Sequence, residues 1–181
     1  KNKDRIIFKG PFAKLVKKEN NTVHQLLKKL RELNLISNYY SIAITKNIPV
    51  FSGLGGGTGN AAFILKFLLK SKINNDVLSK LEKVIGTDLK LFFNRQGYLK
   101  NLKTIVEIKK KHNFFFVLIQ PKIKCSTKEI YSGVKNFSAK ENFNKKMIKS
   151  KNIFLDYLRK SRNDLQFIVE KKYPSINKLL Q

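Results

Sequence analysis

A glycine-rich turn, Ile48-Pro49-Val50-Phe51-Ser52-Gly53-Leu54-Gly55-Gly56-Gly57-Thr58-Gly59-Asn60-Ala61-Ala62, contains five of the nine glycines in this 181-residue chain. Because glycine lacks a Cβ atom, a ligand can approach the backbone closely and several N–H groups can point at one place. A helix beginning here would add the partial positive charge of its N-terminus. The turn therefore predicts a polyphosphate site, with the Thr58 hydroxyl available to a phosphate or to a metal ion bound with it.

Two known phosphate motifs and one purely structural alternative compete for this turn. A P-loop ends in Gly-Lys-Ser/Thr, but the first Lys after these glycines is Lys66, which excludes that motif. The segment Gly57–Ala62 fits the looser dinucleotide pattern, but its acidic residue should end a second strand, whereas Asp76 opens a predicted helix. A tight strand-to-helix connection alone needs fewer glycines.

Hydrophobic periodicity places the turn between a strand and a helix. Alternation predicts a strand over Ser41–Thr45, and Ala61–Leu69 is apolar almost all round, which predicts a nearly buried helix. Upstream, Arg5–Phe8 is a strand candidate. Asn21 precedes an amphipathic helix with apolar positions at Val23, Leu26, Leu27, Leu30 and Leu33.

Further helices and strands are expected after the turn. Asp76 is predicted to cap a helix that ends at Gly86 and has Val77, Leu78, Leu81, Val84 and Ile85 facing inward. Strands are expected at Leu89–Phe93 and Thr104–Ile108, and the Lys-rich run 109–111 is the most linker-like point. Beyond it we expect a strand buried on both faces (Phe114–Ile119), an exposed connection (Val134–Lys151) and helices at Asn152–Arg159, Asn163–Lys172 and Pro174–Gln181. Strands and helices without strict alternation predict an α+β fold.

The composition raises nucleic-acid binding as a function from a different class. The formal charge is +26, from 38 Lys and Arg against 12 Asp and Glu, but the Lys are spread along the whole chain. No RRM, KH, zinc-finger or helix-turn-helix signature is visible. A single Cys, Cys125, excludes an internal disulfide, and the longest apolar run is too short for a membrane span, so we expect a soluble cytoplasmic protein.

The pattern Pro-x-x-x-Gly-Leu-Gly-Gly-Gly-Thr-x-Asn-Ala-Ala, over 49–62, resembles the second motif of the GHMP kinases. Most members have Gly-Leu-Gly-Ser-Ser-Ala here, and the triple Gly is similar to the 4-diphosphocytidyl-2-C-methyl-D-erythritol kinases of the methylerythritol pathway. Gly86–Phe93 (Gly-Thr-Asp-Leu-x-Leu-Phe-Phe) resembles that family's Gly-Ala-Asp-Val-Pro-Phe-Phe block. Asn163-Asp164-Leu165 and Tyr173-Pro174 match later positions, so the resemblance runs from about Ile6 to Gln181.

The resemblance implies an incomplete two-domain α+β fold of GHMP kinase type. Residues 1–112 would be a ribosomal S5 domain 2-like ATP-binding domain without its first strands, and 113–181 part of a ferredoxin-like C-terminal domain. It implies ATP and Mg²⁺ as cofactors and phosphorylation of the 2-hydroxyl of 4-diphosphocytidyl-2-C-methyl-D-erythritol, a small-molecule substrate. Another GHMP sugar or alcohol kinase is the alternative. No nucleic-acid or membrane partner is expected, and the chain would be a monomer or a homodimer.

The resemblance also assigns roles to individual residues. Asp88 matches the carboxylate that takes the proton from the attacking hydroxyl, and Thr58 would also contact the metal. Thr127 and Tyr131 match substrate-side positions, where a Tyr could stack on the cytosine ring. The nucleotide-binding positions are Asn21, Lys46, Pro49, Ser52, Gly53, Leu54, Gly55, Gly56, Gly57, Thr58, Gly59 and Asn60.

Some family features are replaced or missing in this sequence. Gly59 stands where a second hydroxyl residue is usual, and Lys90 stands where Pro is common. The family's N-terminal Pro-Ala-Lys-x-Asn segment and its C-terminal Gly-Ser-Gly-like motif do not occur. Since Lys1 replaces an initiator Met and the final helix stops in its second turn, both ends look truncated. We expect these 181 residues alone to have little or no activity.

Overall fold

The computed structural model describes residues 3–101, 104–108, 112–121, 123, 125–139, 145–148 and 150–180. The chain divides into two compact units, Lys1–Ile108 and Lys109–Gln181. Helices and strands are mixed, as the predicted α+β class requires, and every strand within the described ranges lies in the first unit. The assignment of 1–112 and 113–181 to two GHMP kinase domains stays a prediction. The predicted linker, 109–111, lies outside the described residues.

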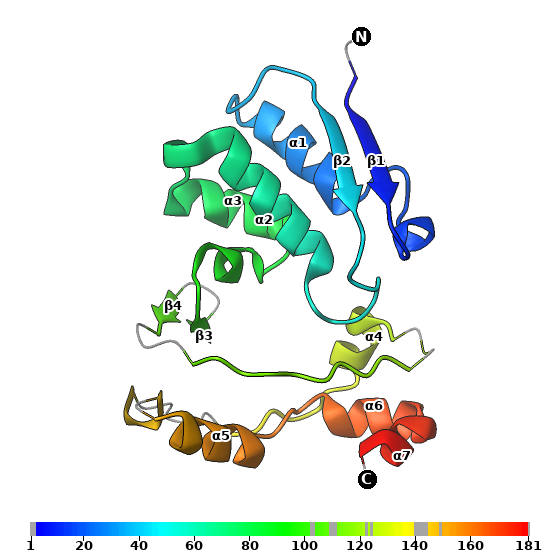
Figure 1. The fold of residues 1–181 in the computed structure, drawn as a ribbon, viewed down its shortest axis with the longest axis vertical. Coiled ribbons are helices and arrows are strands. Elements are labelled where there is room, and N and C mark those ends of the chain that lie inside the picture. Colours follow the sequence, from blue (N-terminus) through cyan, green and yellow to red (C-terminus); the bar gives the residue numbers. More distant parts are fainter. Residues whose placement is uncertain are drawn as a thin grey trace. The chain divides into compact units, whose positions relative to one another are not determined.

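The first unit is built on a parallel strand pair joined by a helix. Strand β1 (Arg5–Lys9) pairs with β2 (Ser41–Thr45) in the register Arg5 to Ser41 through Lys9 to Thr45. Helix α1 (Thr22–Glu32) makes the crossover and lies behind the two strands in Figure 1. Both strands and the amphipathic helix confirm the prediction from periodicity. A short 3₁₀ turn, η1 (Ala13–Leu15), follows β1.

The core of this unit lies among three helices. Helix α1 contacts both α2 (Gly56–Leu69) and α3 (Asn75–Ile85), and the 3₁₀ turn η2 (Lys70–Lys72) links the latter two. The fully buried side chains with the largest volumes are Val23, Leu26, Leu27, Leu30, Leu65, Leu81 and Leu89. A completely buried Leu stabilises the fold by about 1.5–3 kcal/mol relative to an exposed one. These residues therefore form a rigid core that supports α2 and the turn before it.

Two predictions about side-chain direction in these helices are wrong. Helix α2 is not buried all round, because Phe63 and Phe67 are 74% and 71% exposed. These two residues are four apart, so they share one face of the helix, while Ala61, Ile64 and Leu65 face the core. Val84, predicted to face inward, is exposed on α3.

The start of α3 also differs from the prediction. The Asn74 side chain caps the helix by accepting a hydrogen bond from the Val77 N–H at 2.9 Å. Asp76 lies in the first turn instead and forms an exposed ion pair with Lys80. The end of the helix is as predicted, because Gly86 follows Ile85 with a positive φ of 136°.

The strand expected at Leu89–Phe93 is wrong, because this segment is a 3₁₀ helix, η3. Leu89 enters the core and Lys90 is buried as well, a pattern that alternation between two faces does not give. The strand before Thr104 is instead β3 (Gly97–Asn101), which pairs antiparallel with β4 (Thr104–Glu107).

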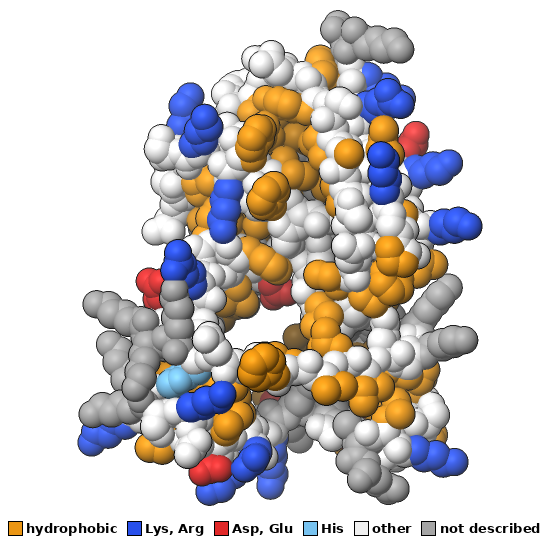
Figure 2. All heavy atoms as spheres, in the orientation of Figure 1, with side chains coloured by type: hydrophobic (Ala, Val, Ile, Leu, Met, Phe, Trp, Pro, Cys, Tyr) orange, Lys and Arg blue, Asp and Glu red, His pale blue; other side chains and the backbone are white. Residues whose placement is uncertain are grey.

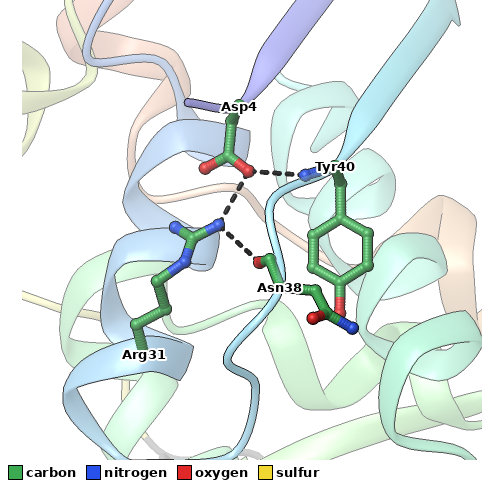
Figure 3. Close-up of polar contacts among 4 residues, drawn as sticks. All are labelled: Asp4, Arg31, Asn38 and Tyr40. Carbon is green, nitrogen blue, oxygen red and sulfur yellow. Dashed lines mark hydrogen bonds and ion pairs between the residues drawn. The ribbon is translucent and has the colours of Figure 1, made fainter. Parts of the chain in front are cut away.

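A charged cluster fastens the start of β1 to the end of α1 (Figure 3). Arg31 donates to the Asp4 carboxylate at 2.7 Å and to the Asn38 carbonyl at 3.0 Å, and the Tyr40 N–H donates to Asp4 at 2.9 Å. The guanidinium also lies 4.5 Å from the centre of the Tyr39 ring. The cluster joins the residues just before β1 to those just before β2, so it fixes the strand pair at its beginning.

The second unit contains short helices and a segment without regular structure. Its elements are α4 (Thr127–Ser132), η4 (Lys145–Ile148), α5 (Lys151–Lys160), α6 (Gln166–Lys172), η5 (Pro174–Ile176) and α7 (Asn177–Leu180). Helix α5 confirms the prediction for 152–159. Helix α6 begins later than predicted because Asn163 makes a turn, accepting from the Leu165 N–H at 3.1 Å. Pro174 opens a 3₁₀ turn rather than an α-helix, and Gln181 lies outside the described residues.

The prediction of a doubly buried strand at Phe114–Ile119 is wrong. The segment has no strand pairing with any described residue, and Phe115 to Ile119 are all at least two-thirds exposed. A buried strand needs neighbouring strands to satisfy its backbone groups. Only Phe114 is partly covered, by the rings of His112 and Phe154. His112 itself is buried and its Nε2 lies 2.7 Å from the Ile148 carbonyl oxygen.

Lys and Arg side chains are scattered over the face drawn in Figure 2 and do not gather in one patch there. None of the helices in the described segments has the length and apolar composition that a membrane span requires.

Candidate functional site

A cavity of about 230 Å³ opens beside the glycine-rich turn, entirely within the first unit. We call it the loop cavity. Its wall runs from Pro49 to Thr58, with Asn60, and is completed by residues from β1, α1 and the end of β2. Of the twelve predicted nucleotide-binding residues, the structure gathers all but Gly59 around this space. The further lining residues are Phe8, Val16, Thr22, Val23, Val50 and Phe51.

The backbone of the turn is left-handed at alternate residues. Phe51, Gly53 and Gly55 have φ values of 65°, 72° and 63°. Alternating left-handed residues direct successive N–H groups toward one side of a turn, an arrangement that binds anions. A Cβ atom on Gly53 would meet nothing within 4 Å, so no packing in the described structure requires glycine there. The positive φ and a close approach by a ligand are the two reasons that remain.

The N-terminus of α2 has no side-chain cap. Gly55 occupies the cap position, and the first turn contains no acidic residue. By contrast, Asn21 and Asn74 accept hydrogen bonds from the first N–H groups of α1 and α3. A helix leaves its first N–H groups without intrahelical partners, and these groups carry partial positive charge. The start of α2 can therefore serve an anion in the loop cavity.

Lys46 is a buried cation in the wall of the same cavity. It is 6% exposed and follows β2 directly, where its backbone N–H donates to the Lys9 carbonyl at 2.6 Å. Loss of hydration lowers the pKa of Lys46 below its ordinary value. No carboxylate in the described part of the chain forms an ion pair with it. An anion in the cavity would compensate this charge.

Two polar side chains of the cavity wall are already engaged by the protein. Asn21 accepts from the Val23 and His24 N–H groups and donates its amide to the Lys17 and Lys18 carbonyls. The Ser52 hydroxyl donates to the Pro49 carbonyl at 2.9 Å. Asn21 therefore holds the wall in shape, and its amide has no free donor for a ligand, while Ser52 keeps its backbone N–H and its oxygen lone pairs.

Several glycines of the turn are packed against side chains from elsewhere. A Cβ on Gly57 would lie 2.9 Å from Thr22 Oγ1, and one on Gly56 would lie 2.8 Å from Lys46 Nζ. Cβ atoms on Gly55 and Gly59 would approach the Phe92 ring to 3.0 and 2.9 Å. The glycines thus have two roles, because they leave room for a ligand on one side and for neighbouring side chains on the other.

Asp88 lines a second cavity, of about 280 Å³, which we call the Asp88 hollow. It is lined by Gly53, Leu54 and Gly55 together with Asp88, Leu91 and Phe92. The three loop residues therefore form a wall shared by both spaces. Asp88 is exposed and immediately precedes η3, whose anchors are the buried Leu89 and the ion pair of Lys90 with Glu82 at 2.8 Å.

Thr58 lies between the loop and the segment that carries Asp88. A Cβ on Gly86 would stand 3.5 Å from Thr58 Oγ1, and Gly86 is two residues before Asp88. The two segments thus carry one hydroxyl, that of Thr58, and one carboxylate, that of Asp88, as oxygen groups of the kind that bind divalent cations. The described residues contain no group of three His, Cys, Asp or Glu side chains that could hold a metal without a ligand's help.

The predicted substrate-side residues lie in the second unit. Thr127 is the first residue of α4, and its side chain lies outside the described part of the structure. Tyr131 is in the same helix and is 54% exposed. Their proposed contact with a substrate stays a prediction.

Sequence reasoning missed several residues of the two spaces, among them Phe8, Val16, Phe51 and Phe92. Phe8 and Val16 flank the end of β1, and their role depends on tertiary structure that periodicity does not report. Phe51 was inside the quoted motif, and an aromatic residue between two predicted backbone-binding positions is a signal that could have been used. Phe92 belonged to the segment taken for a strand.

Residues 20–89, which contain the turn, Asp88 and most of the loop-cavity wall, match the family model of the GHMP kinases N terminal domain. The chain is 35% identical over 180 residues to a protein of Pelagibacter ubique named 4-diphosphocytidyl-2-C-methyl-D-erythritol kinase, covering 97% of this chain and 63% of that protein. It is 31% identical to the protein of that name from Buchnera aphidicola, covering 88% and 54%. The chain thus spans between about half and two-thirds of these curated relatives.

Proposed function

We propose that the chain is the nucleotide-binding part of a small-molecule kinase, because residues 20–89 match the family model of the GHMP kinases N terminal domain. The reaction would be transfer of the γ-phosphate of ATP to the 2-hydroxyl of 4-diphosphocytidyl-2-C-methyl-D-erythritol. The names of the relatives support this acceptor. We take residues 1–112 as the ATP-binding domain and 113–181 as part of a ferredoxin-like C-terminal domain.

The observation that carries the proposal is the meeting of two positive features in one cavity. The uncapped N-terminus of α2 and the buried ammonium of Lys46 lie on either side of Gly56. Without an anion the two repel each other, and neither has a counter-charge among the described residues. A polyphosphate would satisfy both at once.

The residues of the loop would hold the donor phosphates by backbone contacts. The N–H groups of Gly53 to Thr58 would neutralise negative charge without moving, because the left-handed residues fix the turn before a ligand binds. The apolar side chains of the cavity wall, among them Phe8, Val16 and Val23, suit a nucleobase. Asn21 would keep the wall in shape rather than donate to the base.

Asp88 would be the base of the reaction. Phosphoryl transfer depends mainly on positioning and charge neutralisation, with one group near the attacking hydroxyl to accept its proton. Gly53, Leu54 and Gly55 line both spaces, so an acceptor in the Asp88 hollow would lie next to a phosphate bound at these residues. The base and the phosphate-binding backbone would thus act at the same part of the loop.

The donor set around Thr58 fits a magnesium ion bound together with a nucleotide. Mg²⁺ is usually held by one or two protein oxygens with phosphate and water completing its shell, and the Thr58 hydroxyl would be such an oxygen. When bound, the ion would neutralise charge on the phosphates. Thr127 and Tyr131 are proposed on the acceptor side.

A direct assay tests the proposal. The purified full-length protein that contains these residues is incubated with ATP, Mg²⁺ and either the cytidylylated methylerythritol or plain polyol acceptors, and transfer is followed by phosphorus NMR. Phosphorylation of the cytidylylated acceptor alone is expected. Preference for a plain sugar would identify a different GHMP kinase. Salt-sensitive binding to single-stranded or duplex nucleic acid without any nucleotide binding would instead support the nucleic-acid alternative.

A further inference from the structure

Phe51 combines two unfavourable features at the edge of the loop cavity. Its backbone has a φ of 65°, a region that bulky residues adopt at a cost in free energy. Its side chain is 64% exposed, and within the described residues no other ring or cation contacts it. Strained, exposed aromatic residues of this kind are found where a ligand makes use of them.

The surroundings of Phe51 indicate which part of a ligand it would meet. The cavity lining combines polar groups, among them Lys46, Thr58 and the backbone of the turn, with apolar side chains. Phe51 belongs to this lining, and its ring is exposed. A flat apolar group that enters the cavity can therefore meet the Phe51 ring.

We propose that Phe51 stacks on the base of the bound nucleotide and closes the loop cavity over it. Every nucleobase has a π-face, so stacking on an aromatic ring requires no particular hydrogen-bond pattern. This matches a site where the Asn21 amide is fully engaged by the protein. The inference rests on the proposed function, because it assumes that the cavity holds a nucleotide.

The left-handed conformation at Phe51 contributes to the same arrangement. Gly53 and Gly55 also have positive φ values, so Phe51 belongs to the same left-handed stretch of backbone in the cavity wall. Phe51 would thereby contribute its N–H to the phosphate-binding backbone and its ring to the nucleobase. A smaller residue could supply the first contact but not the second.

Four variants and two ligands test the inference by calorimetric titration of the purified protein. Phe51→Leu keeps the size and the backbone strain but removes the aromatic ring, and Phe51→Asn removes the ring in a residue that tolerates positive φ. Both should weaken ATP binding about tenfold. Phe51→Tyr should bind as the wild type does, and so should Phe63→Leu, which changes an equally exposed Phe of α2 outside the cavity. Tripolyphosphate, which has no base, should bind the wild type and Phe51→Leu equally.

The outcomes separate this inference from the proposed function. Unchanged ATP affinity in Phe51→Leu and Phe51→Asn would overturn the stacking role while leaving the kinase proposal in place. Equal weakening of ATP and tripolyphosphate would also overturn it, because the ring would then support the loop and not the base. If the wild type bound neither ligand, both the proposed function and the inference would be wrong.

Discussion

The Lys46 ammonium lies 2.8 Å from the position that a Cβ on Gly56 would occupy. A positive charge thus rests directly against the first residue of α2, whose N-terminus carries a partial charge of the same sign. Two like charges in a poorly hydrated place raise the free energy of the folded protein. This contact is tolerable in the free protein and favourable only with an anion between the two.

Lys46→Met should therefore weaken ATP binding and stabilise the free protein. Loss of one charge-assisted contact of about 2 kcal/mol corresponds to roughly a thirtyfold higher Kd. The free energy of unfolding without ATP should rise, because a desolvated charge disappears. Calorimetric titration and urea unfolding measure the two effects. Lys83→Met, at an exposed position of α3, is the control. A variant that binds ATP as well as the wild type would show that Lys46 does not face the phosphates.

The pH dependence of the free protein follows from the lowered pKa of Lys46. Between the pKa in the folded protein and the ordinary value of 10.5, the unfolded chain binds more protons than the folded one. The free energy of unfolding must then rise with pH over this window, and ATP affinity must fall because Lys46 loses its charge. Both slopes should be smaller in Lys46→Met. They are measured by urea unfolding and titration at a series of alkaline pH values.

Asp88→Asn should abolish turnover and leave ATP affinity within about twofold. Asn has the same shape as Asp but cannot accept the proton, and removal of a general base costs about a hundredfold to ten-thousandfold in rate. Asp76→Asn, which changes another exposed carboxylate of the same unit, should retain full activity. Turnover is measured in the transfer assay, and affinity by titration. Equal activity of wild type and Asp88→Asn would remove Asp88 from the mechanism.

The sequence predicted the first unit better than the second for a physical reason. The elements β1, α1, β2 and α2 are fixed by local periodicity and by glycines whose backbone needs are local. The segment Leu89–Phe93 was misassigned because its helical form depends on burying Leu89 and on pairing Lys90 with Glu82, which lies on another element. Phe114–Ile119 was misassigned because an apolar run indicates a buried strand only when other strands flank it.

The sequence predicted the backbone part of the candidate site. The turn 49–60 was marked by glycines, and the resemblance to GHMP kinases added Asp88 and Asn21. What sequence could not give is which groups are already satisfied. The engagement of Asn21 by four backbone partners and the burial of Lys46 emerge only when the chain is folded.

Lys90 and Glu82 form a nearly buried ion pair, so removing one partner should be strongly destabilising. Lys90→Met would leave the Glu82 charge uncompensated, at a cost of about 3–5 kcal/mol in the free energy of unfolding. The double variant with Glu82→Leu should recover most of this loss, because an apolar pair of similar volume is well tolerated. Urea unfolding of Lys90→Met, of Glu82→Leu and of the double variant measures the interaction energy between the two side chains. Additive effects would contradict a direct interaction.

Gly59 and Phe92 should behave as a coupled pair, because the ring occupies the space that a side chain at position 59 would need. A Cβ on Gly59 would stand 2.9 Å from Phe92 Cε1, a distance that real Cβ contacts do not reach. Gly59→Ser should therefore displace η3 relative to α2 and lower turnover, even though Ser restores the hydroxyl usual in related kinases. Phe92→Leu should lower turnover less than Gly59→Ser does. In the wild type Lys66 Nζ donates to the backbone carbonyl of residue 92 at 2.6 Å, and the Leu variant keeps this backbone contact.

The double variant Gly59→Ser with Phe92→Leu decides between steric coupling and a chemical defect at position 59. If the ring is the obstacle, the smaller Leu makes room for Ser, and turnover should recover to about the level of Phe92→Leu alone. Ala at position 59 should then behave as Ser does, because only the added volume matters. If Gly59→Ser were instead as active as the wild type, Phe92 would have moved aside at no cost, and the ring would not set the distance between the glycine turn and Asp88.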